Sequence, residues 1–252
     1  MNVLRGAAIG ALAALALDAS PALAQAFTPA QSEEIAKIVR DTILKNPDIL
    51  IEAMRLLEER QKLEADAAAR KAIVESWKEL RDDPDSVVGG NPKGDVSFVQ
   101  FYDYKCGYCK RAHPAVVQLM KSDPKVRVVY KELPILGPES MIAARAATAA
   151  RKSDKFARFH DALMTARGSL DEASVLQIAT EVGLDAKKLK SDMASEDVTK
   201  IIFRNRQLAE KLGITGTPAF VVGGQLIPGA IDLTAMRQLV AETRKSCNVA
   251  LC

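Results

Sequence analysis

The chain has 252 residues, of which 48% are hydrophobic and 27% charged, a composition typical of a folded globular protein with a sizeable core. Its formal net charge is only +3, and no dense run of Lys and Arg occurs, which argues against a nucleic-acid partner. Four cysteines are too few for a disulfide scaffold but leave room for a redox pair or a metal site.

The first residues have the pattern of a secretory signal peptide. Arg5 precedes an apolar run over residues 6–17, which is too short to span a bilayer and is broken by Ser20 and Pro21. Small residues over 22–26 offer two overlapping cleavage sites. We therefore predict a signal peptide over residues 1–24, cleaved near residues 24–26, with an uncleaved anchor as the alternative. Export would place the protein in the periplasm, where disulfides persist.

Residues 27–84 are predicted to form an N-terminal helical arm. Thr28, Pro29 and Gln31 have the pattern of a capped helix start, and Asn46-Pro47 separates a first helix from a second. Apolar residues recur at helical spacing, namely Ile35, Ile38, Val39 and Ile43 in the first helix and Leu50, Met54 and Leu57 in the second. The charged, alanine-rich run over 58–71 has little to bury alone. The arm therefore either associates with other copies of the chain through residues 27–81 or packs on its own domain.

After Asp82-Asp83-Pro84 and a Gly- and Pro-containing stretch over 89–94, the pattern changes to alternating strands and helices. Residues 96–102 and 126–131 are predicted as parallel strands joined by a helix over 106–121. Residues 139–212 show helical patterning. A hairpin over 219–227 turns at Gly223-Gly224, and a helix over 232–245 follows. We predict one α/β (α+β) domain over 85–246, a mixed sheet with a helical insertion at about 139–200, and a C-terminal tail over 247–252.

Cys106 and Cys109 lie where the first predicted strand gives way to a helix. A helix N-terminus carries partial positive charge and unpaired N–H groups, so it favours a thiolate at Cys106. Lys105, Lys110 and Arg111 add positive charge nearby. Cys109, one turn later, is close enough to form a disulfide with Cys106 and is predicted to be more buried and less acidic. We interpret the pair as a redox centre with Cys106 as the attacking thiolate and Cys109 as the resolving thiol.

A single C-x-x-C spacing also occurs in metal sites. A closed zinc site needs four ligands, and His113, His160, Cys247 and Cys252 offer no second pair at matching spacing near the motif, so no metal is predicted. Copper(I) capture by two thiolates is the alternative. Cys247 and Cys252 are expected to close a small structural disulfide, with free thiols or an auxiliary redox pair as the alternatives.

Thr217-Pro218 directly precedes the strand predicted over 219–222, where a proline is awkward unless it is cis and faces a site. Residues 98–105 (FVQFYDYK), 133–138 (LPILGP) and 216–220 (GTPAF), in this order, resemble the DsbA family of thioredoxin-fold disulfide oxidoreductases. The resemblance covers about residues 85–245. It implies a thioredoxin fold with a helical insertion, catalytic roles for Cys106, Cys109 and a cis Pro218, and substrate contacts by Thr217, Gly107 and Tyr108.

Two positions depart from the family pattern. Relatives carry a buried acid six residues before the first cysteine, which helps to move the proton of the second thiol. Gln100 stands there and cannot titrate, so Asp103 or a water substitutes, or proton transfer is slower. Tyr108 replaces a histidine of the strongest oxidases, which implies a less stabilised thiolate. Of the histidines, His113 is expected to lie at the surface or to cap the helix, and His160 to be a packing residue.

Residues 27–81 resemble the N-terminal extension of ScsC-like and Com1-like proteins, in which such an arm associates chains. Thr217 before the proline resembles the periplasmic isomerases more than the strong oxidases. The resemblance therefore favours a homo-oligomeric disulfide isomerase or reductase that acts on misfolded or reduced exported proteins and exchanges electrons with a membrane redox partner. A monomeric dithiol oxidase and a copper(I)-binding or chaperone-like protein are the alternatives. No nucleotide or flavin motif occurs, so no organic cofactor is expected.

Overall fold

The computed structural model describes residues 27–246 and 251. The predicted signal peptide and the residues Cys247 and Cys252 lie outside the described residues. The chain divides after Leu57 into two compact units. Among the described residues, no helix is both long enough and apolar enough to cross a membrane.

The first unit contains helix α1 (Pro29–Lys45) and the beginning of helix α2 (Asp48–Glu75), which continues into the second unit. The predicted capping box is present, because Thr28 Oγ1 accepts the N–H of Gln31 at 3.3 Å and Gln31 Oε1 accepts the N–H of Thr28 at 2.9 Å. The first helix ends at the predicted place, where the Asn46 amide donates to the carbonyl of Thr42 at 3.0 Å. None of the residues of α1 is buried, although its apolar face is continuous.

The second unit is built on one mixed sheet of five strands in the order β1-β3-β2-β4-β5. The strands are β1 (Val87–Gly90), β2 (Val96–Tyr102), β3 (Val126–Glu132), β4 (Ala219–Val222) and β5 (Gln225–Pro228). β2 and β3 are parallel, as predicted, and β2 pairs antiparallel with β4. The β4–β5 hairpin turns at Gly223 and Gly224, whose φ angles of 56° and 79° suit a two-residue turn that favours glycine.

Successive side chains of β2 point to opposite faces of the sheet, so they contribute alternately to two hydrophobic cores. Val96, Phe98 and Tyr102 pack with helix α4 (Gly107–Ser122) and helix α10 (Leu233–Ser246). The opposite face, with Val99 and Phe101, packs against Ile73 and the short helix α3 (Trp77–Arg81), and against the end of helix α9 (Glu196–Lys211). Both faces of β2 are therefore buried, which explains its continuous apolar run.

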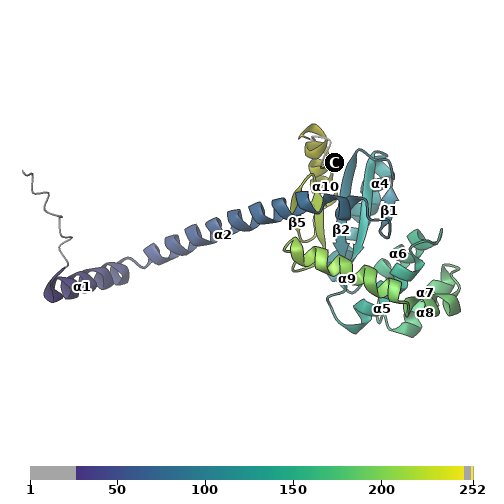
Figure 1. Cartoon of the computed structure of the whole chain (residues 1–252), viewed down its shortest axis with the longest axis horizontal. Helices are drawn as coiled ribbons and strands as arrows, with labels where there is room; N and C mark the ends of the chain where they lie inside the picture. The colour runs from purple at the N-terminus through teal and green to yellow at the C-terminus, as the bar shows by residue number, and fades with distance from the viewer. Residues whose placement is uncertain (1–26, 247–250, 252) are drawn as a thin grey trace, which may run out of the picture. The chain divides into compact units, whose positions relative to one another are not determined.

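Between β3 and β4 the chain forms the predicted helical block, which Figure 1 shows at one end of the sheet. It comprises α5 (Pro138–Ala150), α6 (Phe156–Thr165), α7 (Glu172–Glu181), α8 (Ala186–Met193) and α9. Three of these helices begin at a polar cap: the side chains of Asp171, Asp185 and Ser195 each accept the N–H of the residue three positions later. These local signals explain why the sequence pattern predicts this part well.

Strand β1 was not predicted, because its sequence ends in two glycines that resemble a loop. The structure shows why the glycines are needed. A Cβ atom at Gly89 would lie 2.8 Å from Met120 Sδ and 2.9 Å from the ring of Tyr130. At Gly90, φ is 70° and a Cβ would lie 2.6 Å from the carbonyl oxygen of Val126. The close approach of β1 to α4 and β3 thus requires glycine in the second half of the strand and leaves Val87 and Val88 as its β-branched residues.

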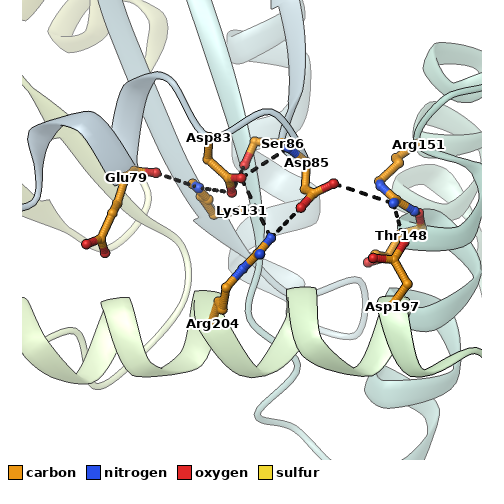
Figure 2. Close-up of polar contacts among 9 residues, drawn as sticks. All are labelled: Glu79, Asp83, Asp85, Ser86, Lys131, Thr148, Arg151, Asp197 and Arg204. Carbon is orange, nitrogen blue, oxygen red and sulfur yellow. Dashed lines mark hydrogen bonds and ion pairs between the residues drawn. The ribbon is translucent and has the colours of Figure 1, made fainter.

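A polar network ties the segment after α3 to the rest of the second unit (Figure 2). Lys131 of β3 is 1% exposed, and its ammonium donates to the carbonyl of Glu79 at 2.9 Å and to Asp83 Oδ2 at 2.8 Å. Asp85 accepts from Arg204 of α9 at 2.5 Å and pairs with Arg151 at 3.5 Å. The predicted arm extends to residue 84, but the chain from Ile73 onward packs with the second unit through these contacts and the apolar core.

The pKa values reflect the burial of this network. Burial lowers the pKa of Lys131, even though Asp83 favours the charged ammonium. Burial alone would raise the pKa of Asp83, but the hydrogen bond and charge of Lys131, with the N–H of Asp85 and the hydroxyl of Ser86, lower it overall. A carboxyl whose pKa is lowered in the folded state stabilises the fold above its unfolded pKa, and this contribution is lost as the pH falls.

We expect the substitution Asp83→Asn to destabilise the protein by about 1–3 kcal/mol at pH 7, because it leaves the buried Lys131 ammonium without its counter-ion. The difference from wild type should shrink as the pH falls below about 4, where the wild-type carboxyl is also protonated. Urea unfolding followed at both pH values measures it. The neighbouring Asp82→Asn is the control, since Asp82 is half-exposed and its ion pair with Arg81 is long, at 3.8 Å, and lies at the surface. Equal losses for the two variants would contradict the assignment.

Candidate active site

Cys106 is the N-cap residue of α4, and its sulfur occupies the position of a capping side chain. Its backbone is extended, with φ −74° and ψ 112°, and its Sγ accepts the N–H of Cys109 at 3.3 Å. Both thiols are free and buried, with Cys106 5% exposed and Cys109 0% exposed. An anionic sulfur at this position meets the positive end of the helix, as the sequence predicts.

The Thr217–Pro218 peptide bond is cis, as predicted, and lies against the cysteine pair. The thiol of Cys106 donates to the carbonyl oxygen of Thr217 at 3.0 Å, across 111 residues of sequence. The carbonyl of Pro218 in turn accepts the N–H of Gly229 at 2.9 Å, which fixes the loop to the end of β5. The structure thus brings Cys106, Cys109, Thr217 and Pro218 together at the ends of β2 and β4.

A hollow of about 190 Å³ lies beside the proline loop. It is lined by residues 213–219 together with Leu226, Pro228 and Gly229. A wider groove of about 610 Å³ lies among α3, β3 and α9, but neither a cysteine nor the proline loop lines it. No cysteine lines the smaller hollow, but Thr217 does, and its carbonyl accepts the thiol of Cys106, so we assign the site to the cysteine pair and this adjoining hollow.

Asp103 organises the turn that leads to Cys106. Its Oδ1 accepts the N–H of Lys105 at 2.7 Å, and its Oδ2 accepts those of Ile135 and Leu136 at 2.9 and 3.1 Å. Its own carbonyl accepts the N–H of Cys106 at 3.1 Å. Asp103 was considered as a substitute for the missing buried acid, but its carboxylate is fully engaged in holding backbone. Its organising role was missed, although an Asp whose side chain accepts the N–H two residues later is a common turn signal.

Gln100 lies in the middle of β2 and is 1% exposed. Neither its amide oxygen nor its amide nitrogen has a hydrogen-bond partner among residues 27–246 and 251. A carboxamide does not titrate near neutral pH, so this position holds a polar group that is neither an acid nor a base.

The mouth of the site is open on one side. Tyr108, between the cysteines, is 60% exposed, and the guanidinium of Arg111 lies 4.1 Å from the centre of its ring. A side chain at Gly107 would meet nothing within 4 Å. Ile135 and Leu136, held by Asp103, are 41% and 53% exposed. Exposed aromatic and apolar side chains thus lie between the cysteines and on the segment that Asp103 holds.

The two histidines lie together rather than apart. His113 is 3% exposed, so the expectation of a surface or capping residue was wrong; its Nε2 is 2.8 Å from Asp161 Oδ1 of α6. His160, the next residue back on α6, packs 5.2 Å from His113, ring to ring. Burial, followed by the charge of His113, lowers the pKa of His160 to about 3. Its role as a packing residue is confirmed, and it makes a polar contact as well.

That contact belongs to a buried chain of polar groups beneath α4. His160 Nδ1 is 2.8 Å from the hydroxyl of Tyr104, which is 3.2 Å from the hydroxyl of Tyr102. Tyr102 in turn donates to Glu132 Oε1 at 2.9 Å. Burial raises the pKa of Glu132. Burial also raises the pKa values of Tyr102 and Tyr104, and the negative charge of Glu132 raises them further. The helical block is therefore joined to the ends of β2 and β3, next to the turn that leads to the cysteines.

Burial also raises the pKa of the Cys109 thiol, well above its ordinary value, with the adjacent Cys106 adding to the effect. The two sulfurs are thereby differentiated: that of Cys106 caps a helix and that residue is 5% exposed, whereas Cys109 is fully enclosed and neutral. This is the asymmetry that a dithiol needs if one sulfur is to attack and the other is to resolve.

A mixed sheet with a C-x-x-C pair at a helix N-terminus, facing a cis proline, defines a thioredoxin-fold dithiol protein. The family model described as DSBA-like thioredoxin domain matches residues 98–241, and the chain belongs to this family of thiol–disulfide oxidoreductases. A second model, described as copper resistance protein ScsC N-terminal domain, matches residues 31–64.

Solved structures agree with this assignment. A thioredoxin-like oxidoreductase from Silicibacter pomeroyi is 48% identical, with a TM-score of 0.66, and the match covers 68% of this chain and 98% of that one. Proteus mirabilis ScsC in a transitional conformation is 33% identical, with a TM-score of 0.66, over 88% of this chain and 100% of that one.

Curated relatives include the thiol:disulfide interchange protein DsbA of Bordetella parapertussis, 29% identical over 60% of this chain and 78% of that protein. The Na(+)/H(+) antiporter NhaA 3 of Salinispora tropica is 31% identical over 63% of this chain, but the match spans only 25% of the antiporter's length. The shared part is thus a minor portion of the antiporter.

In the reduced protein we expect Cys106 to be alkylated by iodoacetamide at pH 7 and Cys109 to resist. In Cys106→Ser, the remaining Cys109 thiol should stay unreactive up to about pH 9, because its raised pKa keeps it neutral. Mass spectrometry of protein quenched at several pH values measures both rates. Protein unfolded in urea is the control, in which the two thiols should react alike. Fast alkylation of folded Cys109 would contradict the assigned asymmetry.

Proposed function

We propose that the chain is a periplasmic protein-disulfide isomerase or reductase that acts as a homo-oligomer on misfolded or reduced exported proteins. The observation that carries the thiol chemistry is the unequal pair of sulfurs at the start of α4, with the carbonyl of Thr217 3.0 Å from Cys106. The oligomeric part rests on the exposed apolar face of the arm. The predicted signal peptide supports export.

In the proposed reaction the Cys106 thiolate attacks one sulfur of a substrate disulfide and forms a mixed disulfide, while the other substrate sulfur leaves as a thiolate. A different substrate thiolate then attacks the substrate sulfur of the mixed disulfide, which forms a new substrate disulfide and releases Cys106 as a thiolate. Alternatively Cys109 loses its proton and attacks Cys106, which leaves the substrate reduced and the pair oxidised. Thr217 and Pro218 lie beside the sulfur, where Thr217 backbone groups suit an extended peptide and Gly107 and Tyr108 leave room for it.

The arm carries many large apolar side chains that no described residue covers. In α1 and the start of α2 these are Ile35, Ile38, Val39, Leu44, Ile49, Leu50, Ile51, Met54, Leu56 and Leu57, each at least 41% exposed. Contiguous apolar surface of this extent is costly in water and marks an association surface. An oligomer would bury it and would present several cysteine pairs to one substrate.

A monomeric dithiol oxidase is the alternative that uses the same residues in the opposite direction. Copper(I) capture by the two thiolates is a second alternative, favoured by the match of the arm to a copper resistance protein domain. Stoichiometric copper(I) in protein purified without chelator, lost in both Cys106→Ser and Cys109→Ser, would support binding; it would not replace a turnover assay.

We expect the mature, reduced protein to reactivate a scrambled, wrongly disulfide-bonded enzyme in a mildly reducing buffer. Cys106→Ser should abolish reactivation because it removes the attacking sulfur, whereas Cys109→Ser should accumulate the mixed disulfide, visible by mass spectrometry. If protein whose cysteine pair is shown to be reduced gives no reactivation, this result would contradict the isomerase proposal and favour the oxidase.

The arm is tested separately by the double variant Ile38→Gln and Leu50→Gln, at sites that are 57% and 51% exposed. We expect it to run at the monomer mass in size-exclusion chromatography with light scattering and to lose most isomerase activity. The matched control is Lys37→Gln with Arg55→Gln, which changes exposed polar residues of the same two helices. A monomeric wild-type protein would contradict the oligomer directly.

A further inference from the structure

The residue directly before the attacking cysteine carries a charge that is held by another element. The ammonium of Lys105 lies 2.5 Å from Glu139 Oε2, in the first turn of α5, and it also donates to the carbonyl of Gly168 at 3.3 Å. Among the described residues these are its two partners, and no bond from it to the Cys106 sulfur is present. Both side chains of the pair are about one-third exposed, at 29% and 35%.

The position of Glu139 is fixed by two further hydrogen bonds to its carboxylate and by the anchoring of the segment that precedes α5. Its Oε1 accepts the hydroxyl of Ser169 at 2.8 Å, and its Oε2 accepts the N–H of Leu170 at 3.1 Å. The start of α5 is held in turn, because the preceding Ile135 and Leu136 donate to Asp103. The carboxylate is therefore built into the frame of the site and does not reach it from a flexible surface position.

Its charge state follows from those contacts. The hydrogen bond from Lys105, followed by those from Leu170 and Ser169, lowers the pKa of Glu139 to about 2. The carboxylate is thus negative throughout the pH range in which thiol exchange occurs. The other charges around the cysteines are Asp103, Lys110, which donates to the carbonyl of Ala166 at 2.5 Å, and Arg111, which stacks on Tyr108.

We propose that Glu139 is a positioning residue of the redox site: it holds the ammonium of Lys105 away from the Cys106 sulfur and so limits the stabilisation of the thiolate. The inference rests on the proposed role of Cys106 as the attacking thiolate. A free ammonium beside the sulfur would stabilise the thiolate, favour the dithiol and make the disulfide more oxidising. By limiting this stabilisation, Glu139 makes the disulfide a weaker oxidant and the dithiol a stronger reductant, which suits attack on substrate disulfides more than donation of its own.

The test is the variant Glu139→Gln, which removes the charge and keeps a side chain of the same size. Two quantities are measured on the full mature chain: the thiolate absorbance of Cys106 as a function of pH, and the equilibrium of protein dithiol plus oxidised glutathione with protein disulfide plus two reduced glutathiones. We expect a larger thiolate fraction at neutral pH and a roughly two- to fivefold shift of the equilibrium toward the dithiol. A tenfold shift would correspond to about 30 mV.

Two matched controls separate charge from structure. Glu172→Gln removes a carboxylate that also lies in a first helical turn and also pairs with a lysine, Lys190, at 2.5 Å, but touches no residue of the site. Ser169→Ala removes one hydrogen bond to Glu139 and leaves both charges. Neither should move the thiolate titration or the glutathione equilibrium.

The decisive comparison uses Lys105→Gln. Since Glu139 is proposed to act through Lys105, Glu139→Gln should have no further effect in the Lys105→Gln background. An undiminished effect there, or no effect of Glu139→Gln in the wild-type background, would overturn the proposal. A pair that fails to equilibrate with glutathione in any variant would instead contradict the proposed redox role of Cys106 and Cys109, so the two failures are distinguishable.

Discussion

The site depends on one buried carboxylate that does no chemistry. Asp103, 2% exposed, accepts three backbone N–H groups from two segments, and its carbonyl accepts a fourth from Cys106. These bonds determine where β2 ends, where α4 begins and where the chain after β3 turns toward α5. Each of them replaces a hydrogen bond to water that burial would otherwise remove. This turn therefore positions the cysteines at the start of α4 and Glu139 at the start of α5.

Much of this arrangement was predictable, because local signals determine it. The apolar run of β2, the glycines of the β4–β5 turn and the polar caps of the helical block each specify their own element. The cysteine pair at a strand–helix junction and the Thr217–Pro218 motif were also recognisable, since their chemistry requires that spacing. The sequence alone thus predicts the fold class and brings the two halves of the site into one domain.

The features that escaped prediction depend on contacts between distant segments. β1 is a strand because it pairs with β3. Its glycines are required by the close approach of neighbouring atoms, and glycine itself has no preference for a strand. His113 is buried because α6, nearly fifty residues away, covers it with Asp161 and His160. The pair of Lys105 with Glu139 joins positions 34 residues apart, and no local pattern indicates it.

Positive charges gather near the cysteine pair, but two of them are bound by acceptors on other segments. The end of α4 and three cationic side chains favour the thiolate, yet Lys105 and Lys110 are both directed to acceptors on α5 and on the chain after α6. Burial of Cys109 works separately, by keeping the second sulfur neutral until it is needed.

Trp77 is the single tryptophan of the chain; it is the first residue of α3, is 8% exposed and packs against the sheet within the second unit. Its indole is therefore an intrinsic fluorophore at the contact of α3 with the sheet. Detachment of α3 from the sheet would transfer the indole to water and shift its emission to longer wavelength, while the cysteine pair and its surroundings stayed folded. The protein thus carries its own optical probe of whether α3 is docked on the sheet.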